Sequence, residues 1–219
     1  MRIIESPPAI FRRLSAPGEF RLDPGEPGHP SVYLTFDDGP IPESTPYVLD
    51  LLDSFGIKAT FFMVGDNVRK YPGLYREVLS RGHRVGNHTM HHLQGLRCAT
   101  ERYLEDVRQA EGYIDSDLFR PPHGAMRRAQ TRAIARHYRI VMMDVVSRDY
   151  SHRLCADDVE RIVRRWTRPG SVVVFHDSIR SIPRREALPR SIEWLLGEGY
   201  EFKLIQKNWT WKKISRYWR

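Results

Sequence analysis

Two histidines four residues apart, and two adjacent aspartates, are the residues of this chain best suited to hold a metal ion. His88 and His92 lie in the stretch Asn87-His-Thr-Met-His-His92, and Asp37-Asp38 precedes it by about fifty residues. Two imidazoles and one carboxylate leave a tetrahedral ion one open position, which a catalytic site needs for water. Histidine-rich stretches also occur as solvated loops or as buried polar residues. The Asp-Asp-Gly turn upstream favours the metal site.

The two aspartates are expected to have different roles. Adjacent side chains diverge, so one can bind the metal while the other faces a water molecule as a general base. The alternative is a simple Asx turn, because Asp-Gly-Pro is ordinary turn chemistry. Two further histidines are not expected to be ligands. His91 cannot easily point at the same ion as His92, and His83, at the start of an apolar run, is expected to be structural.

Three more polar residues form a second group that could transfer protons. Arg120 precedes two prolines, and its guanidinium beside a carboxylate base would orient that base and keep it ionised. His176 follows a strongly apolar run and could be a general acid, with Asp149 orienting it and raising its pKa. The alternatives are a surface arginine packed on its own prolines and a core histidine that ends a strand.

The segments between these residues alternate between apolar runs and amphipathic stretches. Apolar runs predict strands at 32–36, 59–64, 84–86, 118–119, 140–143, 171–175 and 200–205. Helical periodicity predicts helices at 45–55, 75–80, 100–114, 130–137, 156–166 and 187–196. Such alternation indicates parallel βαβ units, and roughly seven of them close into a barrel or near-barrel around one core. We therefore expect a single α/β domain.

The candidate chemical residues all follow predicted strands directly. Asp37-Asp38, the His88/His92 pair, Arg120, Asp149 and His176 are each placed after the end of a predicted strand. In a barrel of βα units these positions converge on one rim, which is the usual place of an active site. The sequence therefore predicts that the metal-binding group and the proton-transfer group form one site.

The composition excludes several classes of protein. The 219 residues include 35 Lys and Arg against 27 Asp and Glu, which gives a net charge of +8. With 41% hydrophobic and 28% charged residues, the chain is neither disordered nor fibrous. No apolar run approaches the ~18 residues of a membrane span. Cys98 and Cys155 form no disulfide framework, and we expect free thiols in a reducing compartment rather than a single bridge.

The two ends of the chain differ from the middle in composition. Residues 1–30 are rich in Pro and Gly and predict an arm that forms no packed element, followed by the barrel at 31–205 and a tail at 206–219. Residues 202–219 hold six Lys or Arg, no acidic residue and three Trp. This segment could contact an anionic membrane surface, but a solvated cap on the barrel is the favoured interpretation. The N-terminus does not look secretory, which favours the cytoplasm, with the inner membrane face as a further location.

Five motifs, taken in order, resemble those of the polysaccharide deacetylase family (NodB-homology domain, carbohydrate esterase family four). They are Thr35-Phe-Asp-Asp-Gly-Pro40, His88-Thr-Met-His-His92, Arg120-Pro-Pro, Ser147-Arg-Asp-Tyr150 and Val173-Val-Phe-His-Asp177. The resemblance covers about residues 31–205. It implies a distorted (β/α) barrel of about seven parallel strands. It also implies a metal-dependent hydrolase that removes N-acetyl groups from amino sugars of peptidoglycan, chitin or related glycans and releases acetate.

The resemblance also implies a role for each matching residue. Asp38, His88 and His92 would hold a divalent metal, most often zinc and in some members cobalt or nickel. Asp37 would be the general base with Arg120 as its partner. His176 would be the general acid, tuned by Asp149. The backbone N–H of His123 would bind the oxyanion. Tyr150 and Val173 would line the pocket for the acetyl methyl group.

Two positions depart from the family pattern. His123 stands where an aromatic residue is common, so only its backbone role carries over, and Val146 stands where many relatives have a further aspartate. Two other functions remain as alternatives. One is a metal-dependent amidase or esterase of the same fold that acts on a small molecule. The other is a basic protein that binds an anionic surface without catalysis; a nucleic-acid partner is not expected.

Overall fold

The computed structural model describes residues 5–14 and 17–206. Within this part, nine strands form one sheet: β1 (Gly25–Glu26), β2 (His29–Asp37), β3 (Thr60–Met63), β4 (Arg84–Asn87), β5 (Leu118–Phe119), β6 (Arg139–Ile140), β7 (Val145–Val146), β8 (Val172–His176) and β9 (Glu201–Phe202). The α-helices are α1 (Ala9–Leu14), α2 (Thr45–Ser54), α3 (Gly65–Lys70), α4 (Pro72–Ser80), α5 (Thr100–Glu111), α6 (Arg128–Ile134), α7 (Ala156–Trp166) and α8 (Ala187–Gly197). Three short 3-10 helices are η1 (Gly95–Arg97), η2 (Pro122–Gly124) and η3 (Ile182–Arg184).

The register of the sheet brings the ends of its central strands together. The main path runs β6-β5-β4-β3-β2-β8-β7, and every pair along it is parallel. The last residue of β2, Asp37, lies opposite Phe62 of β3 on one side and His176 of β8 on the other. Met63 of β3 in turn pairs with Asn87 of β4. The segments that follow β2, β4 and β8 therefore emerge at one edge, as the sequence predicts.

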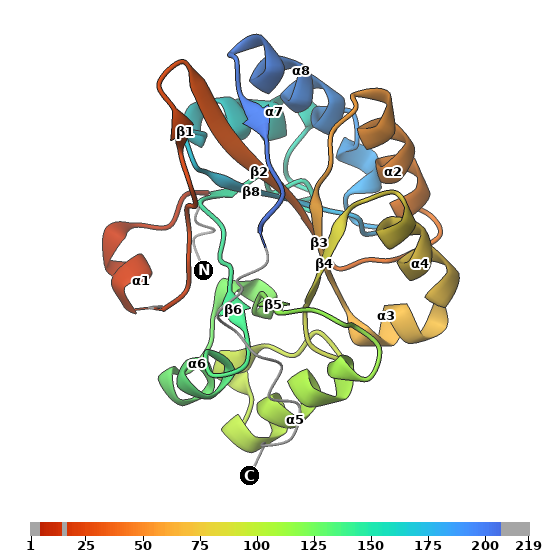
Figure 1. The fold of residues 1–219 in the computed structure, drawn as a ribbon, viewed down its shortest axis with the longest axis vertical. Coiled ribbons are helices and arrows are strands. Elements are labelled where there is room, and N and C mark those ends of the chain that lie inside the picture. Colours follow the sequence, from red (N-terminus) through yellow and green to blue (C-terminus); the bar gives the residue numbers. More distant parts are fainter. Residues whose placement is uncertain (1–4, 15–16, 207–219) are drawn as a thin grey trace.

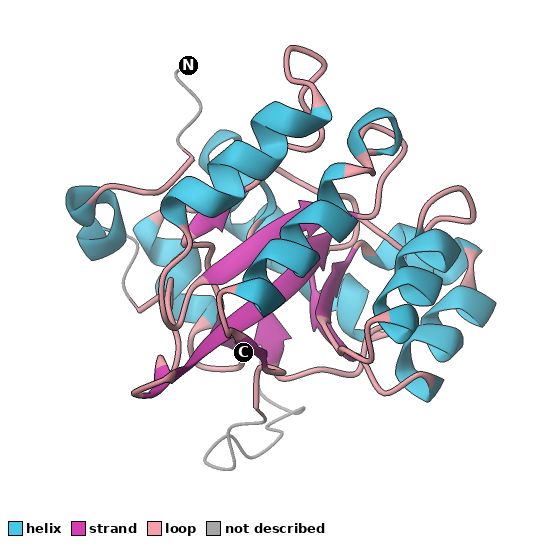
Figure 2. Cartoon of the chain, turned by 90° about the horizontal axis from the view of Figure 1, so that it is seen from above, coloured by secondary structure: helices cyan, strands magenta, loops and turns pink. Residues whose placement is uncertain are grey.

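Helices cover the outside of the curled sheet. Figure 1 shows α2, α4, α7 and α8 around the strands, and Figure 2 shows helices packed along the strands. Residues 31–37 of β2 are all buried, as expected for a strand covered on both faces. Leu49 and Leu52 of α2 and Ile192 of α8 are fully buried in the same cluster as Phe36. The α/β fold with a distorted barrel of seven parallel strands is thus confirmed; the sheet curls into a half-barrel whose path ends at β6 and β7.

The N-terminal segment packs against the sheet, so the expectation of an arm without packed elements was wrong. β1 pairs with the start of β2, and Phe20 is 6% exposed in a cluster with Phe119. Glu19 pairs with Val141 beyond the end of β6, and the Glu5 carbonyl accepts a hydrogen bond of 2.8 Å from Val146 in β7. The segment satisfies backbone groups at both ends of the sheet, which would otherwise stay unpaired.

Two short elements were not expected from the sequence. α3 begins with Gly65-Asp-Asn67, which is typical of a turn, and β7 has only two residues. The strand expected at 140–143 is found at Arg139–Ile140, where it pairs with the two residues of β5, and Val141 beyond it pairs with Glu19. The helix expected at 156–166 matches α7 along its whole length.

The structure bears on the cysteines and on membrane spans, but not on the C-terminal tail. Cys98 is buried and Cys155 is exposed, and both are free, as expected. Of the helices in the described ranges, none has the length and apolar character to cross a bilayer. Residues 207–219, which contain most of the basic aromatic tail, lie outside the described residues, so its contact with a membrane stays a prediction.

Candidate active site

The three expected metal ligands lie together at the end of the central strands. Asp38 directly follows β2, while His88 and His92 belong to the loop that follows β4. One ligand atom of each residue lies within 4.8 Å of those of the other two. The Nε2 atoms of His88 and His92 are 3.7 Å and 3.1 Å from the same carboxylate oxygen of Asp38. Two imidazole nitrogens and one carboxylate oxygen fit a divalent ion such as zinc.

The orientation of His88 is fixed by a backbone carbonyl. Its Nδ1 lies 2.7 Å from the carbonyl oxygen of Arg120, so the ring N–H donates there and leaves the Nε2 lone pair facing the ligand cluster. Burial lowers the pKa of His88 to about 4 and outweighs the charge of Asp37. The imidazole is therefore neutral near pH 7, which is the form that binds a metal.

The charge of Asp38 is also set for metal binding. Burial raises the pKa of this carboxyl, but the hydrogen bond from His92 and the charges of His176 and His88 hold it well below its ordinary value. The carboxyl is therefore ionised over the neutral range. An ionised carboxylate beside two imidazoles is the donor set that the sequence predicts.

Several residues of this loop cluster have left-handed backbone conformations. The φ angle is positive at Asp38 (82°), Thr89 (64°), His92 (55°) and His123 (59°). Such conformations cost free energy in residues other than glycine, and they persist where the surroundings hold them. The carbonyl of Asp38 accepts a 2.8 Å bond from Asn67 of α3, so the unexpected short helix holds the loop that carries a metal ligand.

The expected general base, Asp37, is buried beside a fully buried arginine. Arg120 donates from Nη1 to Asp37 at 2.7 Å and to the Thr35 hydroxyl at 2.8 Å. Its other nitrogens donate to the carbonyls of Val141 and Met142, and the guanidinium lies 4.0 Å above the Phe62 ring. Burial lowers the pKa of Arg120, and the nearby charge of Asp37 opposes this. The guanidinium therefore orients Asp37 as the sequence predicts.

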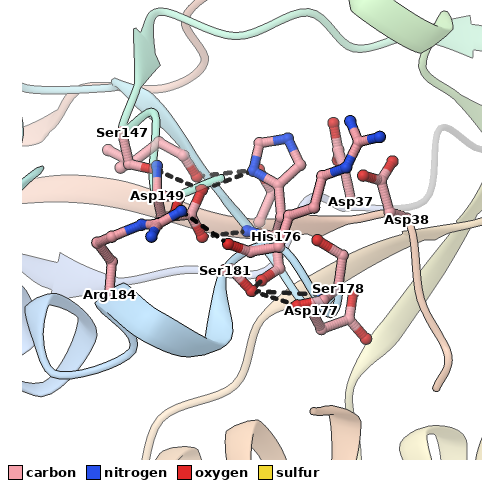
Figure 3. Close-up of polar contacts among 12 residues, drawn as sticks. Asp37, Asp38, Ser147, Asp149, His176, Asp177, Ser178, Ser181 and Arg184 are labelled. Carbon is pink, nitrogen blue, oxygen red and sulfur yellow. Dashed lines mark hydrogen bonds and ion pairs between the residues drawn. The ribbon is translucent and has the colours of Figure 1, made fainter. Parts of the chain in front are cut away.

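The expected general acid, His176, is paired with Asp149. The Nδ1 atom of His176 lies 2.7 Å from one oxygen of Asp149, and the backbone N–H of His176 donates to the other at 2.8 Å. Figure 3 shows the pair with Ser147 and Arg184, which hydrogen-bond to the Asp149 carboxylate and carbonyl respectively. Burial lowers the pKa of His176, but the charge and hydrogen bond of Asp149 outweigh it and raise the pKa to about 9. The imidazole therefore carries a proton at neutral pH, and its Nε2 is left to donate it.

Of the three residues expected around the substrate, His123 and Tyr150 lie beside site residues and Val173 does not. The His123 ring lies 4.8 Å from the His92 ring, and the edge of Tyr150 packs on His176 with ring centroids 4.7 Å apart. Val173 is not brought to the site. It is fully buried in the cluster under the helices, because successive side chains of a strand point to opposite faces. Val174 is the residue that shares the face of His176.

The two histidines set aside as ligands have other partners. The Nδ1 of His91 lies 2.6 Å from Asp106 of α5, so its ring points away from the metal cluster. The Nδ1 of His83 accepts a 3.1 Å bond from the backbone N–H of Ala59, and burial lowers its pKa to about 4. His91 is therefore kept from the ion by Asp106, and His83 has the structural role expected of it.

Sequence reasoning missed several residues that support the site. Thr35 lies two residues before Asp37 and therefore on the same face of β2, so strand alternation could have identified it. Asp177 stands in the same motif as His176, but its side chain bonds to Gly39 of another motif and to Thr45, which lies outside the motifs. Asn67 and Arg184 had no local signal, since they reach the site from two separate short elements, α3 and η3.

Comparison with known proteins agrees with this geometry. Residues 25–143 match the family model for polysaccharide deacetylases. The chain belongs to the polysaccharide deacetylase family. The match contains the three metal-ligand candidates and the Asp37–Arg120 pair, whereas Asp149 and His176 follow it in the chain. The fold brings this second pair to the same strand ends.

Relatives in this family have named activities on two kinds of glycan. A peptidoglycan-N-acetylglucosamine deacetylase of Bacillus cereus is 32% identical over 185 residues, which cover 80% of this chain and 86% of the relative. A chitooligosaccharide deacetylase of Rhizobium leguminosarum bv. trifolii is 34% identical over 154 residues, which cover 67% of this chain and 71% of the relative.

Solved structures of family members have the same fold, and one of these proteins is described as a pseudoenzyme. The Bc1960 peptidoglycan N-acetylglucosamine deacetylase has a TM-score of 0.75 at 30% identity and covers 80% of this chain and 86% of its own. The Bacillus anthracis protein BA3943, described as a family pseudoenzyme, has a TM-score of 0.70 at 26% identity and covers 84% of this chain and 68% of its own. The fold alone therefore does not establish turnover, which must be argued from the site residues.

Proposed function

We propose that this polysaccharide deacetylase is a metal-dependent enzyme that hydrolyses the acetamide of N-acetylated amino sugars in a glycan. One observation carries the proposal: a metal-binding triad, a buried Asp37–Arg120 pair and a charged His176–Asp149 pair converge on one end of one sheet. Hydrolysis of an amide needs an electrophile, a base for water and an acid for the departing amine. The three groups supply one of each.

The metal site contributes the electrophile. The residues that would hold the ion are Asp38, His88 and His92, and a divalent ion there polarises a carbonyl and lowers the pKa of water. Zinc suits this nitrogen and oxygen donor set, and cobalt or nickel can replace it.

Asp37 takes the proton of the attacking water. Its carboxylate is 3% exposed and accepts a charged hydrogen bond from Arg120, which holds one oxygen and leaves the second, Oδ2, 4.0 Å from Nε2 of His88. That second oxygen faces the space around the metal ligands and serves as the base. The proton transfer contributes roughly 10²–10⁴-fold to the rate.

His176 gives a proton to the departing amine. Because Asp149 holds Nδ1, the transferable proton is on Nε2, and the amine leaves as a free amino sugar while acetate is released. The backbone N–H of His123 is the proposed donor to the developing oxyanion, and the ring of Tyr150 limits the space beside His176.

Two observations separate this function from its rivals. A pseudoenzyme or a surface-binding protein has no need of a base oriented by a buried arginine and an acid held charged by a buried aspartate. Between glycans and small molecules, the names of the relatives favour a glycan, and peptidoglycan is preferred over chitooligosaccharides because the B. cereus relative and this chain cover most of each other. The cytoplasmic location stays a prediction.

Acetate release tests the proposal. The zinc-loaded protein is incubated with N-acetylglucosamine oligomers, with peptidoglycan fragments and with simple N-acetyl amides and acetate esters, and both acetate and free amine are measured. The proposal expects equal amounts of acetate and amine from a glycan. Turnover of the small amides or esters alone would replace the glycan with a small-molecule substrate, and no turnover of any N-acetylated compound would refute the enzyme.

A further inference from the structure

Asp177 is a buried carboxylate for which the proposed reaction has no use. It is 1% exposed and directly follows His176 at the end of β8. One oxygen accepts a 3.0 Å hydrogen bond from the backbone N–H of Gly39, and the other accepts a 2.7 Å bond from the hydroxyl of Thr45. Its own backbone N–H donates to the carbonyl of Asp37 at 3.2 Å. Figure 3 shows Asp177 below His176, with Asp37 and Asp38 to the right of that histidine.

These contacts join three parts of the active site. Gly39 follows the metal ligand Asp38, and Thr45 begins α2, so the loop between β2 and α2 is tied to the strand that carries His176. The Thr45 hydroxyl also accepts a 2.8 Å bond from the N–H of Ile41 within that loop. The loop is therefore held at its start and near its end by one carboxylate.

The packing at Gly39 leaves no space for a side chain. A Cβ atom on Gly39 would lie only 1.9 Å from a carboxylate oxygen of Asp177, so the backbone of the loop rests directly on that carboxylate. The preceding residue, Asp38, has a φ of 82°, a conformation that needs support from its surroundings. The hydrogen bond to the next N–H along the chain supplies that support.

The contacts of Asp177 also separate it from an ordinary stabilising ion pair. Within residues 5–14 and 17–206, neither a lysine nor an arginine forms an ion pair with it, and its hydrogen-bond donors are neutral. Burial raises the pKa of Asp177 to about 8, so this carboxyl holds its neighbours through hydrogen bonds and not through an ion pair. These hydrogen bonds join the end of β8 to the loop that carries Asp38, which points to a role in the site.

We propose that Asp177 is a positioning residue, which acts through Gly39 and Thr45 to hold Asp38 in place for the metal and to fix Asp37 relative to His176. The part of this inference that concerns turnover rests on the proposed deacetylase function. The part that concerns metal binding does not, because zinc affinity can be measured without a substrate.

Three variants test the proposal. Asp177→Ala removes the carboxylate, Asp177→Asn keeps an oxygen that can accept from Gly39, and Thr45→Val removes one hydroxyl with little change in shape. The matched control is Asp144→Ala. Asp144 is equally buried, but it is held by Arg168 and Ser171 near the start of β8, at the opposite end of that strand from Asp177.

The measurements are the zinc dissociation constant, from competition with a chromophoric chelator, the thermal unfolding midpoint, and kcat and KM on N-acetylglucosamine oligomers at saturating zinc. For Asp177→Ala we expect zinc to bind about 10–100-fold more weakly, because residues that orient ligands have effects of this size. We also expect kcat to fall about 100-fold with little change in KM, since a misplaced base and acid affect the reaction more than binding. Asp177→Asn should keep most of the wild-type zinc affinity and most of the wild-type kcat. Thr45→Val should lower both quantities, but by less than Asp177→Ala does.

The Asp144→Ala control is expected to lower the unfolding midpoint without a change in zinc affinity or kcat. The proposal is overturned if the Asp177 and Thr45 variants lose stability but keep wild-type zinc affinity and kcat, or if the control changes those two quantities equally. Should Asp177→Ala not fold, Thr45→Val and Asp177→Asn decide the matter. If the wild-type protein does not release acetate, the deacetylase function fails, and the zinc affinities still decide whether Asp177 positions the ligand loop.

Discussion

Replacing Asp149 with asparagine removes the charge that keeps His176 protonated. The pKa of His176 is about 9, against an ordinary value of 6.5. The difference corresponds to roughly 3 kcal/mol in favour of the protonated ring. At pH 7.5 a histidine with a pKa of about 9 is about 97% protonated, and one with a pKa of 6.5 is about 9% protonated. In the variant, burial still lowers the pKa of this histidine and the charges of Asp38 and Asp37 still raise it, so a return to the ordinary value should reduce the rate at pH 7.5 by about tenfold.

The assay is the pH dependence of kcat at saturating zinc, from pH 5 to pH 10. A general acid must be protonated, so its activity is lost as pH rises through its pKa. The wild-type protein should lose activity near pH 9, and Asp149→Asn should lose it near pH 6.5 and recover part of its rate in acid. Asp106→Asn is the matched control, since Asp106 pairs in the same way with His91, which has no role in catalysis. An unchanged alkaline limb in Asp149→Asn would refute the assignment of the acid and its partner.

Three further substitutions test the other groups. Asp37→Asn should lower kcat by about 10²–10⁴-fold while elemental analysis still finds the metal, and full acetate release would refute the base. His88→Ala should lose the metal itself, so a variant that keeps stoichiometric zinc would contradict the ligand set. Arg120→Leu leaves Asp37 buried without a cation and should lower the free energy of unfolding in urea by about 3–5 kcal/mol; an unchanged unfolding curve would show that the pair is not buried as described.

Much of the fold could be predicted because its longer elements have strong periodic patterns. The helix at 156–166 has clear helical spacing, and the buried strand at 171–175 contains three consecutive valines followed by phenylalanine. The two-residue strand β7 could not be predicted, since it is defined by pairing with β8 and not by its own composition. The N-terminal segment has too many prolines for a long regular element, yet its isolated backbone contacts with both ends of the sheet depend on tertiary structure.

The candidate site residues could be found in the sequence, whereas most of the residues that hold them in place could not. The candidate metal ligands and the proposed base and acid are residue types that can do this chemistry, and all follow strands. Val173 was misassigned because its neighbour Val174 has the same chemistry, and only the alternation of β8 distinguishes the face of His176 from the helix-covered face. Asn67 acts through its distance to one carbonyl, and such long-range contacts have no signature in a single sequence.

Anomalous diffraction from a crystal grown with zinc tests the central claim most directly. The account predicts one zinc peak bound by a carboxylate oxygen of Asp38 and by the Nε2 atoms of His88 and His92. It also predicts that Asp37 and His176 lie beside that peak without binding it. Zinc held by other residues, or three ligand side chains that face apart in the presence of zinc, would contradict the account.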